Sequence, residues 1–313
     1  MSEKPDILVV EPWYGEQMKE SAEHFTLHRM DKADDKDAFL ASVADKIVGI
    51  GSNNKASAEI INKLPNLKVI ANFGVGFDGI DVEAAKARGV PVSNTPNVLN
   101  DEVASFAVGL MLATLRRIPQ ADAYVRAGTW EVEKLMAFTQ TATNLKVGIL
   151  GLGGIGLEIS KRLEPFKYDI SYHTRSKRDV AYTYYDSVLE MAKNVSVLIA
   201  IVPGGPATRH MVNREVMEAL GPSGALINVA RGSVVDEEAL VEVLKEGKLG
   251  AAGLDVFEKE PSVPDALKQM TENVILQPHQ ASATHETRMA MARLLMNNLI
   301  EGVAGRPLIT PVY

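Results

Sequence analysis

Three residues with chemically active side chains each follow a short apolar run. Arg231 follows INVA, Glu260 follows AAGLDVFEK and His279 follows VILQP. Because the carboxyl ends of parallel strands meet at one edge of a sheet, we expect this cation, acid and imidazole to lie close together. A ketone that accepts hydride needs a positive group to polarise its carbonyl, a proton donor for the developing alkoxide and a carboxylate to orient that donor. The three residues therefore indicate carbonyl reduction.

A glycine-rich loop supplies a second chemical signal. GLGGIG lies between the apolar run KVGIL and a segment with helical spacing. In this context the first glycine permits a tight turn, the second lets the backbone approach a pyrophosphate, and the third lets the helix pack on the strand. The loop therefore predicts a dinucleotide site rather than a simple turn, and its candidate residues are Gly151, Gly153, Gly154, Ile155 and Gly156.

The end of the next apolar run is basic. About 20 residues after such a loop, an acid that binds the adenosine ribose would indicate NAD. Here the sequence is ISYHTRSKRD, with no acid before Asp179. Hydrogen-bond donors and positive charges suit a 2′-phosphate, so we predict NADPH rather than NADH. The alternative is a solvated basic loop, and the residues concerned are Thr174, Arg175, Ser176 and Lys177.

Nine continuous apolar runs must position these groups. They are DILVVEP, DKIVGIGS, LKVIANFG, KVGILGLG, DISYHT, VSVLIAIVP, GALINVAR, AAGLDVF and NVILQPH. Continuous runs are typical of strands covered on both faces, and segments with helical spacing alternate with them. This order predicts an α/β protein with doubly wound parallel sheets, in two domains divided near residues 93–101. We expect one long helix over residues 101–126, and the last helical segment, 285–303, could belong to either domain.

Composition excludes several classes of protein. The 313 residues are 46% hydrophobic and 23% charged, which is typical of a globular protein with two domains. A net charge of −7 disfavours nucleic acid and anionic membranes as partners. The absence of cysteine excludes disulfides, thiolate metal sites and a cysteine nucleophile, and no metal site is predicted. The N-terminus lacks the pattern of a secretory signal, so we expect a cytoplasmic protein.

The order of four motifs, GLGGIG, NVARGSVVDEEAL, AAGLDVFEKEP and QPHQASAT, resembles the D-2-hydroxyacid dehydrogenase family. The sequence is most similar to its glyoxylate/hydroxypyruvate reductase and hydroxyphenylpyruvate reductase branch. LKVIANFGVGFDGID and RAGTW extend the similarity over almost the whole chain. The resemblance implies a flavodoxin-like substrate-binding domain (1–97 plus 287–313) and a Rossmann dinucleotide-binding domain (98–286), with the C-terminal helix returning to the first.

The resemblance also implies roles for particular residues. Arg231 would bind the substrate carboxylate and carbonyl oxygen, and His279, paired with Glu260, would be the acid in reduction. Backbone N–H groups of Val75 and Gly76 would bind the substrate carboxylate. Further cofactor contacts would come from Val202, Pro203 and Thr208 on the adenine and ribose side and from Ala230 and Asp255 beside the nicotinamide.

Some assignments stay open at this stage. Glu258 rivals Glu260, which is preferred because a proline follows it, and Asp255 could instead act through structural hydrogen bonds. Gln280 could add a polar contact near the substrate. Three other histidines lie in segments without an identifiable partner: His24, His28 and His210.

The resulting functional prediction is NADPH-dependent reduction of a short 2-keto acid, glyoxylate or hydroxypyruvate, to the D-2-hydroxy acid. One alternative is a reductase of bulkier acids such as phenylpyruvate or hydroxyphenylpyruvate. Another is a non-catalytic dinucleotide-sensing protein, although a sensor does not need a proton donor. A homodimer is expected, in which residues 130–138 could reach the active site of the neighbouring subunit.

Overall fold

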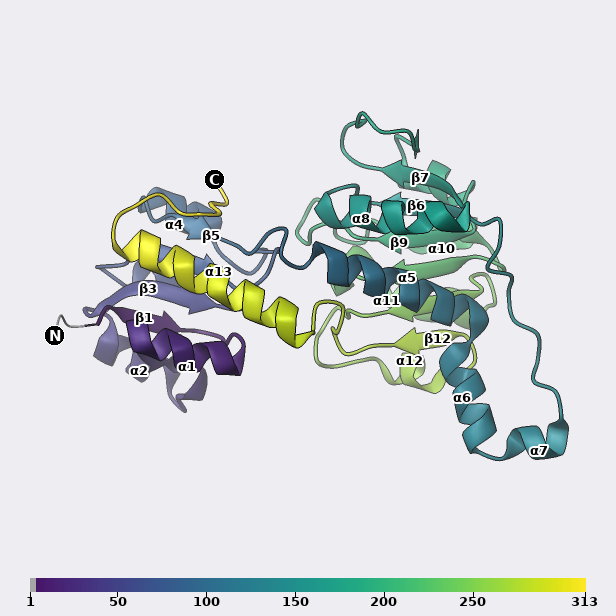
Figure 1. Ribbon diagram of the computed structural model, residues 1–313, viewed down its shortest axis with the longest axis horizontal. Helices are drawn as coiled ribbons and strands as arrows, with labels where there is room; N and C mark the ends of the chain where they lie inside the picture. Colours follow the sequence, from purple (N-terminus) through teal and green to yellow (C-terminus); the bar gives the residue numbers. More distant parts are fainter. Residues whose placement is uncertain (1–3) are drawn as a thin grey trace. The chain divides into compact units, whose positions relative to one another are not determined.

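The computed structural model describes residues 4–313 and divides them into two compact units. One unit comprises the chain up to Leu99 together with Thr284–Tyr313, and the other comprises Asn100–Ala283. Each contains one parallel sheet with helices around it, which confirms the predicted α/β class (Figure 1). None of the described helices is long and apolar enough to cross a membrane.

The first unit has a five-stranded sheet in the order β2-β1-β3-β4-β5. Its strands are β1 (Asp6–Val9), β2 (Thr26–Arg29), β3 (Ile47–Ser52), β4 (Val69–Asn72) and β5 (Val92–Ser93). Its helices are α1 (Gly15–His24), η1 (Met30–Lys32), α2 (Lys36–Val43), α3 (Ala58–Asn62), α4 (Val82–Ala87) and α13 (His285–Val303). The C-terminal helix α13 packs against β3 and β4, which settles the alternative that the sequence left open.

The second unit has a seven-stranded sheet in the order β12-β11-β10-β9-β6-β7-β8. Its strands are β6 (Lys146–Leu150), β7 (Asp169–His173), β8 (Thr183–Tyr184), β9 (Val197–Ala200), β10 (Ala225–Asn228), β11 (Ala251–Leu254) and β12 (Val274–Leu276). Its helices are α5 (Asn100–Arg116), α6 (Ile118–Arg126), α7 (Thr129–Glu133), α8 (Gly154–Leu163), η2 (Glu164–Phe166), α9 (Val188–Ala192), α10 (Arg214–Leu220), η3 (Gly232–Val234), α11 (Glu237–Lys245) and α12 (Asp265–Gln269).

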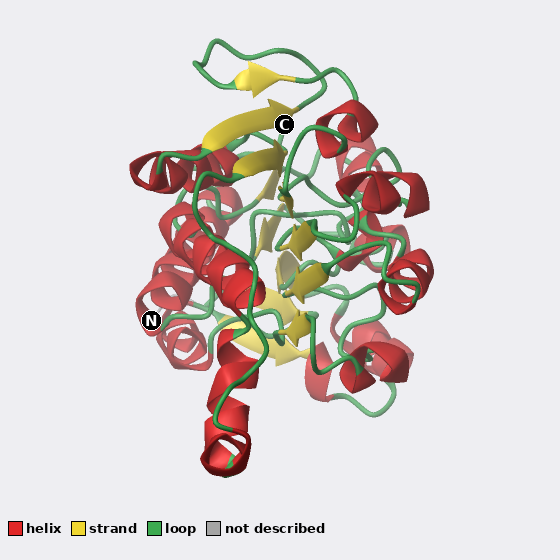
Figure 2. Cartoon of the chain, turned by 90° about the vertical axis from the view of Figure 1, so that its right-hand side faces the viewer, coloured by secondary structure: helices red, strands yellow, loops and turns green. Residues whose placement is uncertain are grey.

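Apolar side chains on both faces of the seven-stranded sheet are buried under helices. On one face Leu198 and Leu226 pack with Met217 of α10, and on the other Ile199 and Ile227 pack in a cluster with α5 and α8. Figure 2 shows helices on both sides of the strands. This two-sided burial explains why the central strands are continuous apolar runs in the sequence.

The expected single helix over residues 101–126 is wrong. The structure contains α5 and α6, separated at Arg117, which adopts a left-handed backbone with a φ of 48°. Pro119 follows at the start of α6. In an uninterrupted helix its ring would clash with the carbonyl of Leu115, and it has no N–H to donate. A new helix therefore begins at Ile118, with Pro119 in its first turn.

Candidate active site

The predicted acid and imidazole are in direct contact. Nδ1 of His279 lies 2.7 Å from Oε2 of Glu260, and the other carboxylate oxygen, Oε1, accepts the backbone N–H of Phe257 at 3.1 Å. His279 follows β12 and Glu260 follows β11, its neighbour in the sheet. The two side chains are 46% and 34% exposed, so the pair lies at the surface of its unit, where a ligand can reach it.

The pKa of Glu260 lies below its usual range. Burial raises it, but the hydrogen bond and charge of His279, the Phe257 N–H and the charge of Arg231 together lower it further. Glu260 is therefore ionised at neutral pH and can accept a hydrogen bond from the Nδ1–H group of the imidazole. Of the two candidate acids, Glu260 is the one that contacts His279, whereas Glu258 contacts Arg209.

Arg231 follows β10, the next strand in the sheet, and its backbone is held by a side chain that sequence reasoning missed. Asn228 is 1% exposed; its Nδ2 donates to the Arg231 carbonyl at 3.0 Å and its Oδ1 accepts the Ala230 N–H at 3.1 Å. Nη1 of Arg231 donates to the Ala230 carbonyl at 2.8 Å. The only sequence signal is that a polar residue ends an otherwise apolar strand.

Asp255 holds the loop that carries His279. Its carboxylate accepts the backbone N–H groups of Gln280 at 2.6 Å and Ala281 at 3.0 Å, and its carbonyl accepts that of His279 at 2.9 Å. Burial raises the pKa of Asp255, and the two N–H donors oppose this rise. The contacts are those of the structural alternative considered for Asp255. Its contact with a nicotinamide stays a prediction.

The glycine loop has the geometry that a dinucleotide requires. Gly151 has a φ of 105°, and a Cβ there would lie 2.7 Å from the Ile201 carbonyl oxygen. A Cβ at Gly156 would lie 2.1 Å from the Gly151 carbonyl oxygen, so only glycine lets α8 approach the strand this closely. Around Gly153 the space is open, since a Cβ there would meet no atom of the described residues within 4 Å, and Gly153 itself offers no side chain to cap α8. These residues fit a pyrophosphate at the helix N-terminus.

The basic loop lies at the end of β7, beside β6, the strand that leads into the glycine loop. Thr174 Oγ1 donates to the Ser176 carbonyl at 2.6 Å and so shapes the turn. Arg175 and Lys177 are exposed, and within residues 4–313 neither forms an ion pair with an acid. Their positive charges are therefore not neutralised within the described protein.

The residues predicted on the adenine and ribose side follow β9. Val202 lies against the glycine loop, since a Cβ at Gly151 would be 2.9 Å from its Cγ1. Thr208 Oγ1 donates to the Pro203 carbonyl at 2.7 Å, which folds the loop back on itself. The structure thus brings Val202 to the glycine loop and joins Thr208 to Pro203.

The loop with Val75 and Gly76 follows β4 in the first unit. Its carbonyl groups are already hydrogen-bonded: Asn72 Nδ2 donates to the Gly76 carbonyl at 2.8 Å, and Asn94 Nδ2 donates to that of Val75 at 2.8 Å. Within the described residues, the N–H groups of Val75 and Gly76 donate to no protein acceptor. Unpaired backbone N–H groups of a loop are able to bind an anion without a charged side chain.

Two histidines for which the sequence identified no partner have one in the structure. His28 Nε2 lies 2.6 Å from Asp6 Oδ1, and His210 Nε2 lies 3.2 Å from Glu258 Oε1. Asp6 and His28 lie on paired strands, and Glu258 is far from His210 in the chain. Contacts of this kind depend on topology and leave no local pattern in the sequence.

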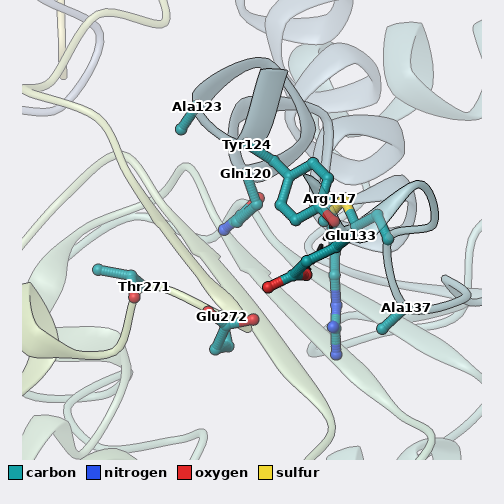
Figure 3. A pocket seen from close by; sticks show the side chains of 9 residues that line it. Arg117, Gln120, Ala123, Tyr124, Glu133, Ala137, Thr271 and Glu272 are labelled. Carbon is teal, nitrogen blue, oxygen red and sulfur yellow. Dashed lines mark hydrogen bonds between the residues drawn. The ribbon is translucent and has the colours of Figure 1, made fainter. Parts of the chain in front are cut away.

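A cavity of about 400 Å³ lies elsewhere in the second unit (Figure 3). Arg117, Gln120 and Tyr124 line it from α6 and the residue before it, and Glu272 lines it from the turn before β12. Tyr124 Oη donates to Glu133 Oε2 at 2.8 Å beside it. Glu272 precedes β12, whereas His279 follows it. The cavity therefore lies at the amino-terminal end of the parallel strands, opposite the end that carries the candidate active site.

Comparison with known proteins defines the class. Residues 108–281 match the family model of the D-isomer specific 2-hydroxyacid dehydrogenase NAD binding domain. The chain belongs to this family, and it is an oxidoreductase with an NAD(P)-binding domain. The predicted family resemblance, fold and enzyme class are confirmed.

Three relatives are similar to the chain over most of its length. Hydroxyphenylpyruvate reductase of Plectranthus scutellarioides is 49% identical over 277 residues, 88% of each chain. Glyoxylate/hydroxypyruvate reductase A of Arabidopsis thaliana is 43% identical over 309 residues, 98% of each chain. The crystal structure of an NADPH-dependent glyoxylate/hydroxypyruvate reductase from Sinorhizobium meliloti, in complex with NADP and malonate, matches with a TM-score of 0.92 and 42% identity, covering 99% of this chain and 97% of that one.

Proposed function

We propose that the protein uses NADPH to reduce a short 2-keto acid, glyoxylate or hydroxypyruvate, to the D-2-hydroxy acid. The observation that carries the proposal is the contact between His279 Nδ1 and the Glu260 carboxylate, with Arg231 just after the neighbouring strand β10. A non-catalytic dinucleotide sensor does not need a proton donor held by an ionised carboxylate. The names of the Arabidopsis and Sinorhizobium relatives give the same substrates.

The proton route follows from the contacts of His279. Because Nδ1 faces the Glu260 carboxylate, a protonated imidazole keeps its Nδ1–H there and presents its Nε2–H to the substrate. That proton passes to the carbonyl oxygen as the keto carbon becomes a hydroxyl-bearing carbon. The Arg231 guanidinium polarises the same carbonyl and binds the carboxylate beside it. Val75 and Gly76 stay candidate backbone donors to a carboxylate.

The cofactor would be held by the glycine loop, the basic loop and the loop after β9. When bound, a reduced nicotinamide supplies the hydride that the keto carbon accepts. The first turn of α8, between Gly153 and Gly156, would bind the pyrophosphate, and Arg175 with Lys177 would bind the 2′-phosphate. Ala230 would lie on the nicotinamide side.

Arg175 gives a direct test of cofactor choice. Arg175→Gln is expected to weaken NADPH binding by about 10- to 100-fold, because a hydrogen bond between charged groups contributes about 1.5–3 kcal/mol. NADH binding should change by less than about threefold, since NADH has no 2′-phosphate. Isothermal titration with each cofactor measures both. Lys167→Gln, at the opposite end of β7, is the matched control and should leave both affinities unchanged. Equal weakening for both cofactors would exclude a 2′-phosphate contact.

A reductase of bulkier keto acids is the second candidate. It is favoured by the 49% identity to hydroxyphenylpyruvate reductase. The kcat/KM values for glyoxylate, hydroxypyruvate and phenylpyruvate, each with NADPH and NADH, distinguish the two. The proposal requires the two small acids to be preferred over phenylpyruvate, and the reverse order would assign the second function.

We also infer a homodimer, supported by the exposed apolar side chains of residues 118–138. Six large hydrophobic residues there are more than half exposed: Ile118, Val125, Trp130, Val132, Leu135 and Phe138. Figure 1 shows α6 and α7 extending away from the sheet of their unit. An exposed apolar surface of this kind is typical of a protein interface. In the dimer, residues 130–138 would reach the partner's active site.

Sedimentation equilibrium tests the dimer. We expect a mass of about twice the 33.9 kDa of the chain, and a shift toward the monomer for the double variant Val132→Asp with Phe138→Asp, because charges are costly at an apolar interface. Ile309→Asp, at an exposed apolar residue of the first unit, is the control. A monomeric wild-type protein would contradict the dimer. The cytoplasmic location stays a prediction, to be tested by cell fractionation.

A further inference from the structure

Glu258 lies two residues before Glu260 but has partners of its own. Its Oε1 accepts a hydrogen bond from Arg209 Nη2 at 2.7 Å and lies 3.2 Å from His210 Nε2. The Glu258 side chain is 20% exposed. Burial raises its pKa, but the hydrogen bonds from His210 and Arg209 lower it below the usual range. An ionised, largely buried carboxylate thus binds two neighbouring residues of the loop after β9.

The backbone around Glu258 is held by further hydrogen bonds and by close packing. Its N–H donates to Glu237 Oε2 of α11 at 3.2 Å. The preceding residue, Phe257, packs so closely on Gly232 that a Cβ there would lie 1.9 Å from the Phe257 carbonyl carbon. Phe257 also donates its N–H to Glu260. The loop after β11 is therefore a fixed support that already carries the candidate proton-orienting carboxylate.

The loop after β9 has few anchors of this kind. Thr208 bonds back to Pro203 and Gly205 within the loop, and the first backbone bond to another loop is from the His210 N–H to the Ser233 carbonyl at 2.8 Å. Within the described part of the chain, residues 203–209 hydrogen-bond to another loop only through Arg209 and Glu258. This segment contains Pro203 and Thr208, the candidate contacts for the cofactor.

We propose that Glu258 is a positioning residue that ties the cofactor-side loop after β9 to the loop that carries Glu260. The inference rests on the proposed function, since it takes residues 203–208 as part of the dinucleotide site. Without the Glu258 charge, residues 203–209 adopt the conformation that binds the cofactor for a smaller fraction of the time. Apparent affinity then falls in proportion to that fraction, even though Glu258 itself does not contact the cofactor.

The test is the Kd of NADPH measured by isothermal titration. Glu258→Gln is expected to raise Kd by about tenfold, corresponding to a competent loop population of about one tenth. The KM for NADPH should rise by the same factor, while kcat at saturating NADPH falls by less than about threefold, because His279 and Glu260 keep their contact. Arg209→Ala should raise Kd similarly, and combining it with Glu258→Gln should add little, since both remove one interaction.

Glu218→Gln is the matched control. Glu218 also accepts bonds from two cations, Arg214 at 2.8 Å and Lys248 at 3.0 Å, but it lies on α10 outside the loop after β9. Its removal should leave Kd unchanged. If Glu258→Gln fails to fold, Arg209→Ala decides, because the Arg209 side chain is 55% exposed.

Each result has one meaning. A rise in Kd for Glu258→Gln or Arg209→Ala without a rise for the control supports the positioning role. Wild-type binding of NADPH together with an unchanged Kd in both variants overturns this inference alone. A wild-type protein that does not bind NADPH overturns the proposed function, and this inference with it.

Discussion

His279→Ala is expected to lower kcat for keto-acid reduction by about 10²- to 10⁴-fold, the usual contribution of a positioned general acid. In the structure Nδ1 of His279 is bound to Glu260 at 2.7 Å, which leaves Nε2 as the group that delivers the proton. Alanine removes the donor without touching the glycine loop, so the Kd of NADPH should stay nearly unchanged. Steady-state kinetics with hydroxypyruvate and titration with NADPH measure the two quantities.

The matched control for this prediction is His24→Ala. His24 is an exposed histidine at the end of α1, in the first unit, and should be dispensable. If His279→Ala keeps close to the full rate, the proton comes from another group and the role assigned to the His279–Glu260 pair is wrong. If both kcat and NADPH binding collapse together, the substitution has disturbed the loop and not only the proton donor.

Arg231→Ala should have a comparable effect through a different route. The guanidinium is assigned both to the substrate carboxylate and to the carbonyl oxygen. Two charged hydrogen bonds of about 1.5–3 kcal/mol each correspond to a loss of about 10²- to 10⁴-fold in kcat/KM. Because the carboxylate contact exists before the reaction and the carbonyl contact strengthens during it, KM should rise and kcat should fall. Kinetics over a range of hydroxypyruvate concentrations separate the two effects.

Arg231→Lys sharpens the test. Lysine keeps the charge but not the planar pair of donors, so we expect a loss smaller than that of alanine and larger than that of an ordinary surface substitution. The Asn228 bonds to the Ala230–Arg231 backbone do not involve the Arg231 side chain and should persist. An unchanged KM in both variants would show that the carboxylate binds elsewhere.

The central strands and the edge strand β12 could be predicted from sequence, but the three other edge strands could not. Strands buried on both faces leave continuous apolar runs, and all nine predicted runs contain strands. The three strands that were missed, β2, β5 and β8, lie at sheet edges. Edge strands have one partner and can be short or polar, as TLHR of β2 is, so their sequence differs little from that of a loop.

The candidate site shows the same division. Residues that follow the carboxyl-terminal ends of neighbouring parallel strands are brought together by topology. Arg231, Glu260 and His279 could therefore be predicted as neighbours from their positions alone. The supports of the site left less signal. The sequence allows structural hydrogen bonds for Asp255 but does not identify their partner at Gln280, 25 residues away. The contacts of Asn228 with the Ala230–Arg231 backbone could not be predicted.

A single-turnover reaction tests the central assignment most directly. Wild-type protein is mixed with hydroxypyruvate and an equimolar amount of NADPH, and the loss of NADPH absorbance is compared with the amount and configuration of the hydroxy acid recovered by chiral chromatography. We predict one molecule of the D-2-hydroxy acid for each NADPH consumed. Bound NADPH that is not consumed with hydroxypyruvate, glyoxylate or phenylpyruvate, or a product of the L configuration, would contradict the account.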